Sequence, residues 1–542
     1  MSRATGIAMR VTDLSVALVE TGESIIKGVS LDLHPGKIFA LVGESGSGKS
    51  VTSLAAMRLL PQALAITGGA VQVAGEDLFD LSEAQMQRVR GRQVAMIFQN
   101  AMTALNPVQT AGKQVAETLR LHTKLRGDAL RKRVVQLFAE VGISDPDSRY
   151  SFYPHQLSGG QQQRVMIAMA LACEPDILIA DEPTTALDVT IQEQVLELVR
   201  ELAQSRHLAV LLITHDMGVV RNTADEVAVM YRGEIIEQAP VDDFFHNPQQ
   251  AYSQRLIDAL PDLSHFQSTA VDEPLLQLEG VKVYFPIRKG VLQRVVDYTR
   301  AVDGVSLSIG RGETYALVGE SGSGKSTLGR AILNLEGIAG GTIQFQGKPI
   351  HGLGRRDMLP FRKQIQVIFQ NPFSSMNPRL TVGEVIAEGM VSLGVGLDDM
   401  ERQERIGQLL QRVQLSRDVG QRYPHEFSGG QLQRVAIARA LAVEPELIIC
   451  DEPTSALDVS IRAEVLQLLQ QLQREFGVSY LFITHDLSII PSLAHHVGVM
   501  QRGKIVEQGS AQQILTAPRH PYTRALLASV PRIDRAKSDV PG

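Results

Sequence analysis

The chain has 542 residues, of which 44% are hydrophobic and 21% are charged, and its formal net charge is −6. This composition is typical of folded protein, and the mildly acidic balance excludes a global basic field that would recruit nucleic acid. The length predicts at least two domains, because single hydrophobic cores stop growing at about 250–300 residues.

The beginning of the chain and its apolar segments give no indication of membrane insertion. Residues 1–6 lead into mixed polar sequence, so we expect no signal peptide. No stretch reaches the about 18–20 uninterrupted apolar residues that a membrane-spanning helix requires. The cysteines, Cys173 and Cys450, are too few for a disulfide framework and suit a reducing compartment.

An apolar run at residues 38–42 ends in the glycine-rich sequence Gly-Glu-Ser-Gly-Ser-Gly-Lys-Ser at residues 43–50. Glycines at these positions let backbone N–H groups converge on phosphates, and the following helix contributes its positive N-terminal end. We expect Lys49 to reach the β- and γ-phosphates of a nucleotide and Ser50 to ligate Mg²⁺. The nucleotide-binding residues predicted in this segment are Gly43, Ser45, Gly46, Gly48, Lys49, Ser50 and Val51.

The next apolar run ends at Gln99, and the composition changes after it. The Gln99 amide is a candidate for contact with the metal ion or the attacking water. Residues 101–156 are predicted to form an inserted helical subdomain. One amphipathic helix in it is indicated by apolar residues at helical spacing, namely Leu130, Val134, Leu137, Phe138 and Val141.

The sequence Leu-Ser-Gly-Gly-Gln at residues 157–161 precedes another predicted helix. A serine hydroxyl and exposed glycine amides at a helix start form a second anion-binding surface. The glycine-rich sequence at residues 43–50 is a P-loop. If the helical subdomain lies far from the P-loop of the same half, this surface serves the nucleotide of the other half. Its predicted contact residues are Ser158, Gly159 and Gln161.

Two further apolar runs, residues 177–180 and 210–213, end in candidate catalytic residues. Asp181 suits Mg²⁺ support, and Glu182 suits orientation and polarisation of the attacking water. Early proton removal by Glu182 is disfavoured, because the ordinary pKa of glutamate is near 4.3. We expect His215 to donate a hydrogen bond to the γ-phosphate. Continuous apolar runs indicate strands of a parallel sheet, whose carboxyl ends bind ligands.

The same arrangement recurs in the second half of the chain. Lys49 and Lys325 are separated by 325 − 49 = 276 residues, and His215 and His485 by 485 − 215 = 270. A nearly constant offset indicates that a whole domain is duplicated. The second set of predicted site residues is Gly319, Ser321, Gly322, Gly324, Lys325, Ser326, Thr327, Gln370, Ser428, Gly429, Gln431, Asp451, Glu452 and His485.

The repeat also predicts the domain limits. The first domain is expected over residues 1–261, a short polar linker over 262–274 and the second domain over 275–542. The counterpart of the first helical insertion is expected over residues 372–426.

Taken together, these motifs resemble the ATP-binding domain of ABC transporters over nearly the whole chain, twice. Arg164, Arg434 and the Ala-Leu-Asp sequences at residues 186–188 and 456–458 extend the match. The resemblance implies an α/β fold with two tandem P-loop ATPase domains, each a mostly parallel sheet core with a β subdomain and an inserted helical subdomain.

The resemblance further implies that the halves form a head-to-tail ATPase dimer within one chain. ATP held by Lys49 would then meet Ser428, Gly429 and Gln431, and ATP held by Lys325 would meet Ser158, Gly159 and Gln161. Both halves keep the glutamate and the histidine, so both sites are expected to hydrolyse ATP with Mg²⁺.

A narrower resemblance is to the dipeptide, oligopeptide, nickel, glutathione and microcin C importer branch. It rests on residues 98–107 and 369–378 and on the tails at 247–256 and 520–527. It implies two integral-membrane permease subunits, an extracytoplasmic solute-binding protein, no nucleic-acid partner, and a peripheral location at the cytoplasmic face of the bacterial inner membrane.

Two departures from this branch matter. Several relatives carry tail cysteines that hold an iron–sulfur cluster, and this chain has none there, so no cluster is expected. The resemblance makes Phe285 the adenine-stacking residue of the second half, whereas Leu18 aligns with it in the first. We therefore expect weaker ATP binding at the Lys49 site.

Two alternatives stay open at this point. A soluble tandem ABC ATPase acting on ribosomes or nucleic acid would be expected to show a long basic linker, a coiled-coil insertion or zinc cysteines. An exporter subunit is the other alternative, and the tail resemblance favours import over it.

Overall fold

A computed structural model describes residues 6–99, 104–184, 189–258, 273–289, 294–396, 398–455, 457 and 459–528. The chain forms two compact units, one containing the described residues up to Asp258 and the other those from Glu273 onward. Only residues 273 and 274 of the predicted linker are described, and Pro274 already begins a strand. The predicted domain limits therefore stay a prediction.

The first unit is built on a six-stranded sheet in the order β10-β9-β3-β8-β7-β6. All neighbouring strands in it are parallel except the antiparallel pair β9–β10. Its strands are β3 (Ile38–Val42), β6 (Val94–Ile97), β7 (Ile177–Asp181), β8 (Ala209–Thr214), β9 (Glu226–Tyr231) and β10 (Glu234–Pro240). The continuous apolar runs predicted as buried parallel strands are confirmed.

A second, antiparallel sheet in the order β2-β1-β4-β5 forms the β subdomain. Its strands are β1 (Met9–Leu18), β2 (Ser24–Leu33), β4 (Leu64–Val73) and β5 (Glu76–Asp77). The helices of the α/β core are α1 (Lys49–Ala56), α2 (Glu83–Val89), α8 (Val189–Arg206), α9 (Met217–Thr223), α10 (Val241–His246) and α11 (Ala251–Asp258).

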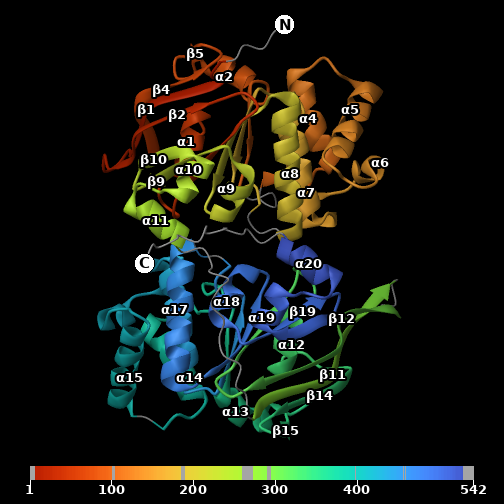
Figure 1. Cartoon of the computed structure of the whole chain (residues 1–542), viewed down its shortest axis with the longest axis vertical. Helices are drawn as coiled ribbons and strands as arrows, with labels where there is room; N and C mark the ends of the chain where they lie inside the picture. Colours follow the sequence, from red (N-terminus) through yellow and green to blue (C-terminus); the bar gives the residue numbers. More distant parts are fainter. Residues whose placement is uncertain are drawn as a thin grey trace, which may run out of the picture. The chain divides into compact units, whose positions relative to one another are not determined.

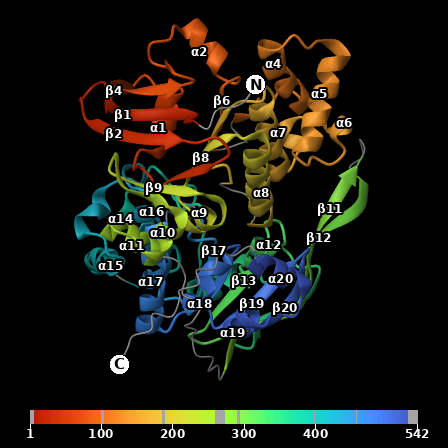
Figure 2. The same ribbon diagram turned by 45° about the horizontal axis from the view of Figure 1, so that its top comes forward.

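The helical insertion lies between β6 and β7, as predicted, but with α7 it continues past the predicted limit at residue 156. It contains α4 (Ala111–His122), α5 (Gly127–Glu140), α6 (Pro146–Arg149), the 3₁₀ helix η1 (Pro154–Gln156) and α7 (Gly159–Leu171). The predicted amphipathic helix is α5, whose apolar positions are buried. In Figures 1 and 2 the insertion gathers on one side of the unit and the β subdomain with α1 on the other.

The core sheet is buried on both faces, and strand β7 shows why. Alternate side chains point to opposite faces of a strand. Leu178 and Ala180 therefore pack in the cluster formed with the helical insertion, whereas Ile177 and Ile179 pack in the cluster formed with the β subdomain. With both faces covered, only the strand ends can present polar groups to solvent.

The second unit repeats this plan with core order β16-β17-β18-β13-β19-β20 and β-subdomain order β12-β11-β14-β15. Its core strands are β13 (Thr314–Val318), β16 (Ile365–Ile368), β17 (Leu447–Asp451), β18 (Ser479–Thr484), β19 (His496–Gln501) and β20 (Lys504–Ser510). The strands of its β subdomain are β11 (Pro274–Lys289), β12 (Arg294–Gly310), β14 (Gly340–Phe345) and β15 (Lys348–Pro349).

The helices of the second unit follow the same division. The core carries α12 (Lys325–Ile332), α13 (Arg355–Gln364), α17 (Val459–Phe476), η4 (Leu487–Ile489), α18 (Ile490–Leu493), α19 (Ala511–Thr516) and α20 (Pro521–Ala528). The insertion carries α14 (Val382–Ser392), α15 (Asp399–Arg412), η2 (Arg417–Gln421), η3 (Pro424–Glu426) and α16 (Gly429–Leu441).

The units differ most in the β subdomain. Strands β11 and β12 have 16 and 17 residues, whereas β1 and β2 have 10 each. The longer hairpin extends past the rest of its sheet (Figure 1), because the pairing of β11 with β14 ends at Lys282. In the part of the chain that the structure covers, no helix has the length and apolar character needed to span a membrane.

Candidate nucleotide-binding and hydrolysis sites

The two P-loops connect β3 to α1 and β13 to α12. Gly43 adopts a φ of 152°, and a Cβ atom there would lie 2.2 Å from the carbonyl oxygen of Met230 at the end of β9. At Gly319 the corresponding Cβ would lie 2.1 Å from the Met500 carbonyl oxygen. Only glycine permits this approach, so each P-loop lies directly against the neighbouring strand.

Each P-loop lysine folds back into its own loop. The Lys49 ammonium donates to the carbonyl oxygens of Gly43 and Glu44 at 2.7 and 2.8 Å. The Lys325 ammonium makes the equivalent two bonds, both of 2.8 Å. Both side chains are buried. The positive charge thus lies inside the loop in which nucleotide phosphates are expected to bind.

The other predicted P-loop residues lie around this charge. Gly48 and Gly324 cap the following helices in the left-handed conformation. Exposed loop positions are Ser45, Gly46, Ser321 and Gly322, and the half-buried first-turn positions are Ser50, Val51, Ser326 and Thr327.

Each predicted metal-binding carboxylate is paired with its predicted serine. Ser50 Oγ donates to Asp181 Oδ1 at 3.0 Å, and Ser326 Oγ donates to Asp451 Oδ1 at 2.8 Å. Burial raises the pKa of Asp181 from 3.8 to about 6, and burial likewise raises the pKa of Asp451. A buried carboxylate beside a hydroxyl is an all-oxygen donor set, which fits Mg²⁺. The positive charge of Mg²⁺ would in turn stabilise the ionised form of the carboxylate.

Glu182 joins three sequence-distant segments of the first unit. Its carboxylate accepts a hydrogen bond from Gln99 Nε2 at 2.7 Å, and its other oxygen lies 3.0 Å from His215 Nδ1. The three residues follow the carboxyl ends of the neighbouring strands β6, β7 and β8. All three predicted catalytic residues are therefore brought together.

The second unit forms the same triplet. Gln370 Nε2 donates to Glu452 at 2.8 Å, and His485 Nδ1 lies 3.1 Å from the other carboxylate oxygen. Burial alone would raise the pKa of Glu452, but the His485 contact and Lys325 together hold it below the ordinary value. The hydrogen bond to Glu452 raises the pKa of His485. The glutamate is thus ionised at neutral pH and keeps lone pairs for a water.

Both glutamates also have an unusual backbone, which the sequence did not indicate. Glu182 has a φ of 46° and Glu452 a φ of 48°, in the left-handed region that non-glycine residues seldom adopt. The N–H groups of Glu182 and Glu452 donate to the carbonyl oxygens of Ile213 and Ile483, both at 2.9 Å, which holds this conformation. Such strain concentrates at functional sites, where it aims a side chain.

The two Ser-Gly-Gly-Gln sequences form helix starts, as predicted. Ser158 Oγ accepts from Gln161 N at 3.3 Å, and Ser158 N donates to Gln161 Oε1 at 3.2 Å. Ser428 and Gln431 form the same capping box in front of α16. Both serines, with Gly159 and Gly429, are exposed. The helices that they begin, α7 and α16, belong to the helical insertions and lie on the side of each unit away from α1 or α12 (Figure 2).

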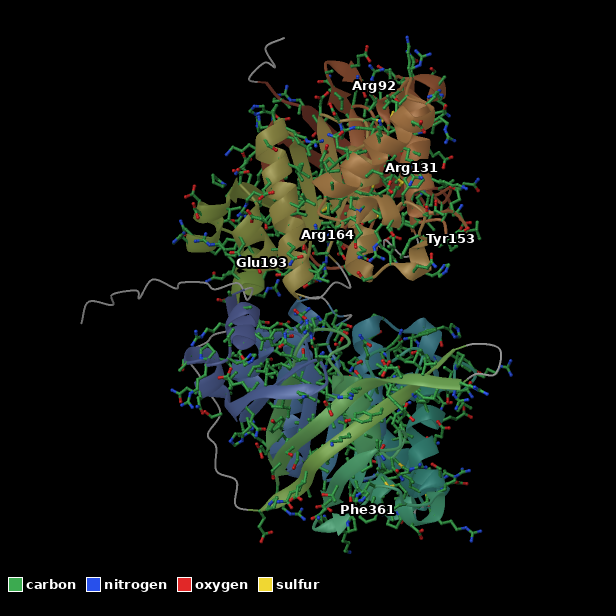
Figure 3. All side chains as sticks on the ribbon, turned by 90° about the vertical axis from the view of Figure 1, so that its right-hand side faces the viewer. Arg92, Arg131, Tyr153, Arg164, Glu193 and Phe361 are labelled. Atoms are coloured by element: carbon green, nitrogen blue, oxygen red, sulfur yellow. The ribbon has the colours of Figure 1, made fainter. Side chains whose placement is uncertain are left out.

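We call the Ser-Gly-Gly-Gln sequences at residues 158–161 and 428–431 the signature sequences. The arginine that follows each of them bonds its helix to a neighbouring helix of the same unit. Arg164 (Figure 3) donates to Gln194 on α8 at 3.0 Å, and Arg434 is paired with Glu464 on α17 at 2.6 Å. The Ala-Leu-Asp sequences at 186–188 and 456–458 lie outside the described residues except Leu457.

The positions proposed for adenine stacking correspond in strand register. Phe285 is paired with Thr299 across β11 and β12, and Leu18 N donates to Glu23 O at 2.9 Å across β1 and β2. Thr299 and Glu23 are themselves 299 − 23 = 276 residues apart, the offset of the P-loops. Phe285 is 38% exposed, which leaves its ring accessible for a base. Its role and the other site roles stay predictions.

Sequence reasoning missed one pair of residues next to the P-loops. The N–H of Glu44 donates to Tyr252 Oη at 3.2 Å, and the N–H of Glu320 donates to Tyr522 Oη at 3.1 Å. The signal was present, since the two tyrosines are 522 − 252 = 270 residues apart, the offset of the histidines. Sequence distance from the P-loop concealed the contact.

Comparison with known families decides the class of these sites. The model described as "ABC transporter" matches residues 26–185 and 302–455. The chain belongs to the ABC transporter family. It is thus an ATPase whose hydrolysis of ATP is coupled to transport. A second model, "Oligopeptide/dipeptide transporter, C-terminal region", matches residues 236–275 and 506–542.

Full-length relatives support the same class. The peptidoglycan transport ATP-binding protein YejF of Agrobacterium fabrum is 46% identical over 534 residues, which are 98% of this chain and 97% of that protein. The glutathione import ATP-binding protein GsiA of Escherichia coli (strain K12) is 46% identical over 564 residues, 97% of this chain and 90% of that protein. The resemblance to fused tandem ATPases of the importer branch is confirmed.

Among solved structures, cbiO1 from Clostridium perfringens, part of the ABC transporter complex cbiONQ, is 30% identical. The alignment covers 45% of this ABC ATPase and 92% of cbiO1, with a TM-score of 0.40.

Proposed function

We propose that this chain is the ATP-hydrolysing, energy-coupling subunit of a bacterial importer for peptides or peptide-like compounds. The observation that carries the proposal is the duplication of a complete set of hydrolytic residues in a chain with two oligopeptide/dipeptide C-terminal regions. The names of the similar proteins, peptidoglycan transport and glutathione import, favour a substrate that contains peptide bonds.

In this proposal each unit binds ATP and Mg²⁺ through its P-loop. Lys49 and Lys325 neutralise phosphate charge, and Ser50 with Asp181 and Ser326 with Asp451 hold the cation. Mg²⁺ supplies charge neutralisation on the β- and γ-phosphates when it is bound. No iron–sulfur cluster takes part.

Hydrolysis depends on the glutamate triplets. Glu182 orients the attacking water, Gln99 holds the carboxylate from one side and His215 from the other. In the second unit His485 and Lys325 hold the pKa of Glu452 below its ordinary value, so that this carboxylate accepts a hydrogen bond from the water as charge builds on the phosphate. The same roles fall to Glu452, Gln370 and His485.

The exposed signature residues are proposed to complete the site of the other half. A helix start favours a phosphate through its first N–H groups and the helix dipole, and both helices begin with an exposed glycine, Gly159 in α7 and Gly429 in α16. Closure of the halves around two ATP molecules, followed by hydrolysis and reopening, would then drive the permease. Nucleotide acts here by stabilising the closed state.

Two integral-membrane permease subunits are the proposed partners, with an extracytoplasmic solute-binding protein to deliver the substrate. The chain would sit peripherally at the cytoplasmic face of the inner membrane. Contact with the permease is expected near Gln99 and Gln370, because these residues join the helical insertion to the catalytic glutamate.

Uptake tests the transport assignment. A strain lacking this gene should take up labelled oligopeptides, muropeptides or glutathione more slowly, and the wild-type gene should restore uptake. The Glu182→Gln, Glu452→Gln double variant should not restore it. Normal uptake of every compound in the deletion strain, with ribosomes or nucleic acid co-purifying with the chain, would instead support the soluble ATPase alternative.

Charge reversal at a signature serine tests the composite sites. In a Lys325→Ala background only the Lys49 site binds ATP, so Ser428→Glu should weaken that binding by placing a carboxylate against the γ-phosphate. The reciprocal Ser158→Glu change in the same background should leave binding at the Lys49 site intact. If Ser158→Glu is the change that weakens it, each unit uses its own signature.

A further inference from the structure

A single peptide group in each P-loop is held at both of its ends. In the Gly43–Glu44 peptide the carbonyl oxygen accepts from Lys49 Nζ at 2.7 Å, and the N–H donates to Tyr252 Oη at 3.2 Å. The lysine is the group expected to move onto the phosphates when nucleotide binds. The tyrosine hydroxyl gives this peptide a hydrogen bond that does not depend on the position of the lysine.

The second unit repeats the arrangement. The Gly319–Glu320 peptide accepts from Lys325 Nζ at 2.8 Å and donates to Tyr522 Oη at 3.1 Å. The sequences of the two C-terminal segments differ, Ala-Tyr-Ser-Gln-Arg against Pro-Tyr-Thr-Arg-Ala. Recurrence of the contact in both units argues against a chance encounter.

Each tyrosine is itself held by a docked segment. Glu237 on β10 accepts hydrogen bonds from the N–H groups of Gln249 and Gln250 at 2.7 and 3.0 Å, just before α11. Leu256 and Ile257 of α11 are buried. Figures 1 and 2 show α11 beside α10 and near β9, the strand against which the P-loop lies.

The second unit anchors its segment by the same device. Glu507 on β20 accepts from the N–H groups of Arg519 and His520 at 2.7 and 3.0 Å. Leu526 and Leu527 of α20 are buried. In both units the tyrosine is thus carried on a short helix whose approach is fixed by a carboxylate.

The conformation of the P-loop explains why such a hold matters. Gly43 and Gly319 have φ values of 152° and 153°, which only glycine readily adopts. The peptide that follows such a glycine can rotate with little steric hindrance. Rotation would turn the carbonyl oxygen away from Lys49 Nζ and the N–H away from Tyr252 Oη, and would thereby change the backbone path of the loop that is expected to bind the phosphates.

We propose that Tyr252 and Tyr522 are positioning residues of the ATP sites, each locking the first peptide of a P-loop in the phosphate-binding orientation. The C-terminal region of each unit is then part of the nucleotide site, through one hydroxyl group. This role rests on the assignment of the two P-loops as ATP sites.

Replacement of both tyrosines by phenylalanine removes the hydroxyl groups and keeps the rings. In the purified full-length chain, Tyr252→Phe with Tyr522→Phe should raise the ATP concentration for half-maximal binding and hydrolysis by about 3- to 10-fold, with kcat within about 2-fold of wild type. Hydrogen exchange at the Glu44 and Glu320 amides of the ligand-free protein should become faster. The melting temperature should stay within about 2 °C.

Tyr480→Phe is a matched control. Tyr480 also makes one hydroxyl-to-backbone bond, to Leu469 O at 3.1 Å, but it pairs with Thr314 at the end of β13 away from the P-loop. It should leave ATP affinity unchanged. Wild-type affinity in the double tyrosine variant would overturn the proposal, as would a fall in kcat and melting temperature equal to that of the control.

The basis of the proposal is checked separately. Lys49→Ala with Lys325→Ala should abolish ATP binding in the otherwise wild-type chain. Full binding in that variant would overturn the ATP-site assignment itself, whereas loss of binding there with unchanged affinity in the tyrosine variant overturns only the positioning role.

Discussion

Replacing Asp181 by asparagine should stabilise the ligand-free protein at neutral and alkaline pH. Burial raises the pKa of Asp181 from 3.8 to about 6. A carboxyl group whose folded pKa lies above its unfolded value contributes stability that is fully present below about pH 3.8 and is lost as the pH rises through 6. Asparagine carries no charge at any pH, and its oxygen can still accept the Ser50 hydrogen bond.

The expected size follows from the two pKa values. A difference of about 2 pKa units corresponds to about 3 kcal/mol, because one unit is worth 1.36 kcal/mol. The gain should therefore be about 3 kcal/mol at pH 8 and about half of that at pH 5, where much of the wild-type carboxyl is still protonated in the folded state. At pH 8 this corresponds to about 6–12 °C in the melting temperature of the first unit.

Scanning calorimetry of the ligand-free protein is the suitable assay, because the chain contains no tryptophan for fluorescence. Asp80→Asn is the control, since Asp80 is exposed in the turn after β5 and its change should alter stability by less than about 0.5 kcal/mol. Addition of Mg²⁺ with ATP should make wild type melt at a higher temperature than Asp181→Asn, because the bound cation stabilises wild type more than the variant. Equal gains at pH 5 and pH 8, or a less stable variant at pH 8, would refute the reasoning.

Three further predictions concern the nucleotide sites. Glu182→Gln with Glu452→Gln should retain ATP binding and lower hydrolysis by roughly 10²–10⁴-fold in a phosphate-release assay, and near-normal turnover would contradict the assigned role. ATP titrations with each P-loop lysine disabled in turn should show weaker ATP binding at the first site than at the second. Leu18→Phe should strengthen binding at the first site and Phe285→Leu should weaken it at the second, each changing the binding free energy by roughly 1–3 kcal/mol. Equal affinities at the two sites would argue against unequal adenine stacking. Gly43→Ala should abolish ATP binding at the first site by calorimetric titration, because its Cβ would lie 2.2 Å from a carbonyl oxygen of β9, and wild-type affinity would show that the loop can shift.

Much of the fold could be predicted because its signals are local. The run at residues 177–180 ends in Asp181 and must be buried on both faces, so a parallel core strand with a functional carboxyl end followed directly. The α5 helix was equally predictable, because its apolar positions recur at helical spacing. The longer β11–β12 hairpin was not, since its added residues leave the sheet and carry no core-facing pattern.

The triplet of Gln99, Glu182 and His215, which are predicted to be catalytic, shows the limit of local reasoning. Gln99, Glu182 and His215 were each chosen from a strand end, but their hydrogen bonds depend on the order of β6, β7 and β8 in the sheet. The left-handed backbone of Glu182 was also beyond prediction, because a bond to Ile213 in the next strand holds it.

By itself, the sequence determined that the chain contains two P-loop units, which residues end their strands, and that the units are copies. These conclusions rest on glycine content, apolar periodicity and constant offsets, which are properties of neighbouring residues or of the repeat. The tertiary structure alone decided that Tyr252 reaches Glu44 across 208 residues and that Tyr522 reaches Glu320 across 202. The physical reason is that a hydrogen bond between remote segments depends on how strands and a docked helix pack, and no pattern along the chain encodes that distance.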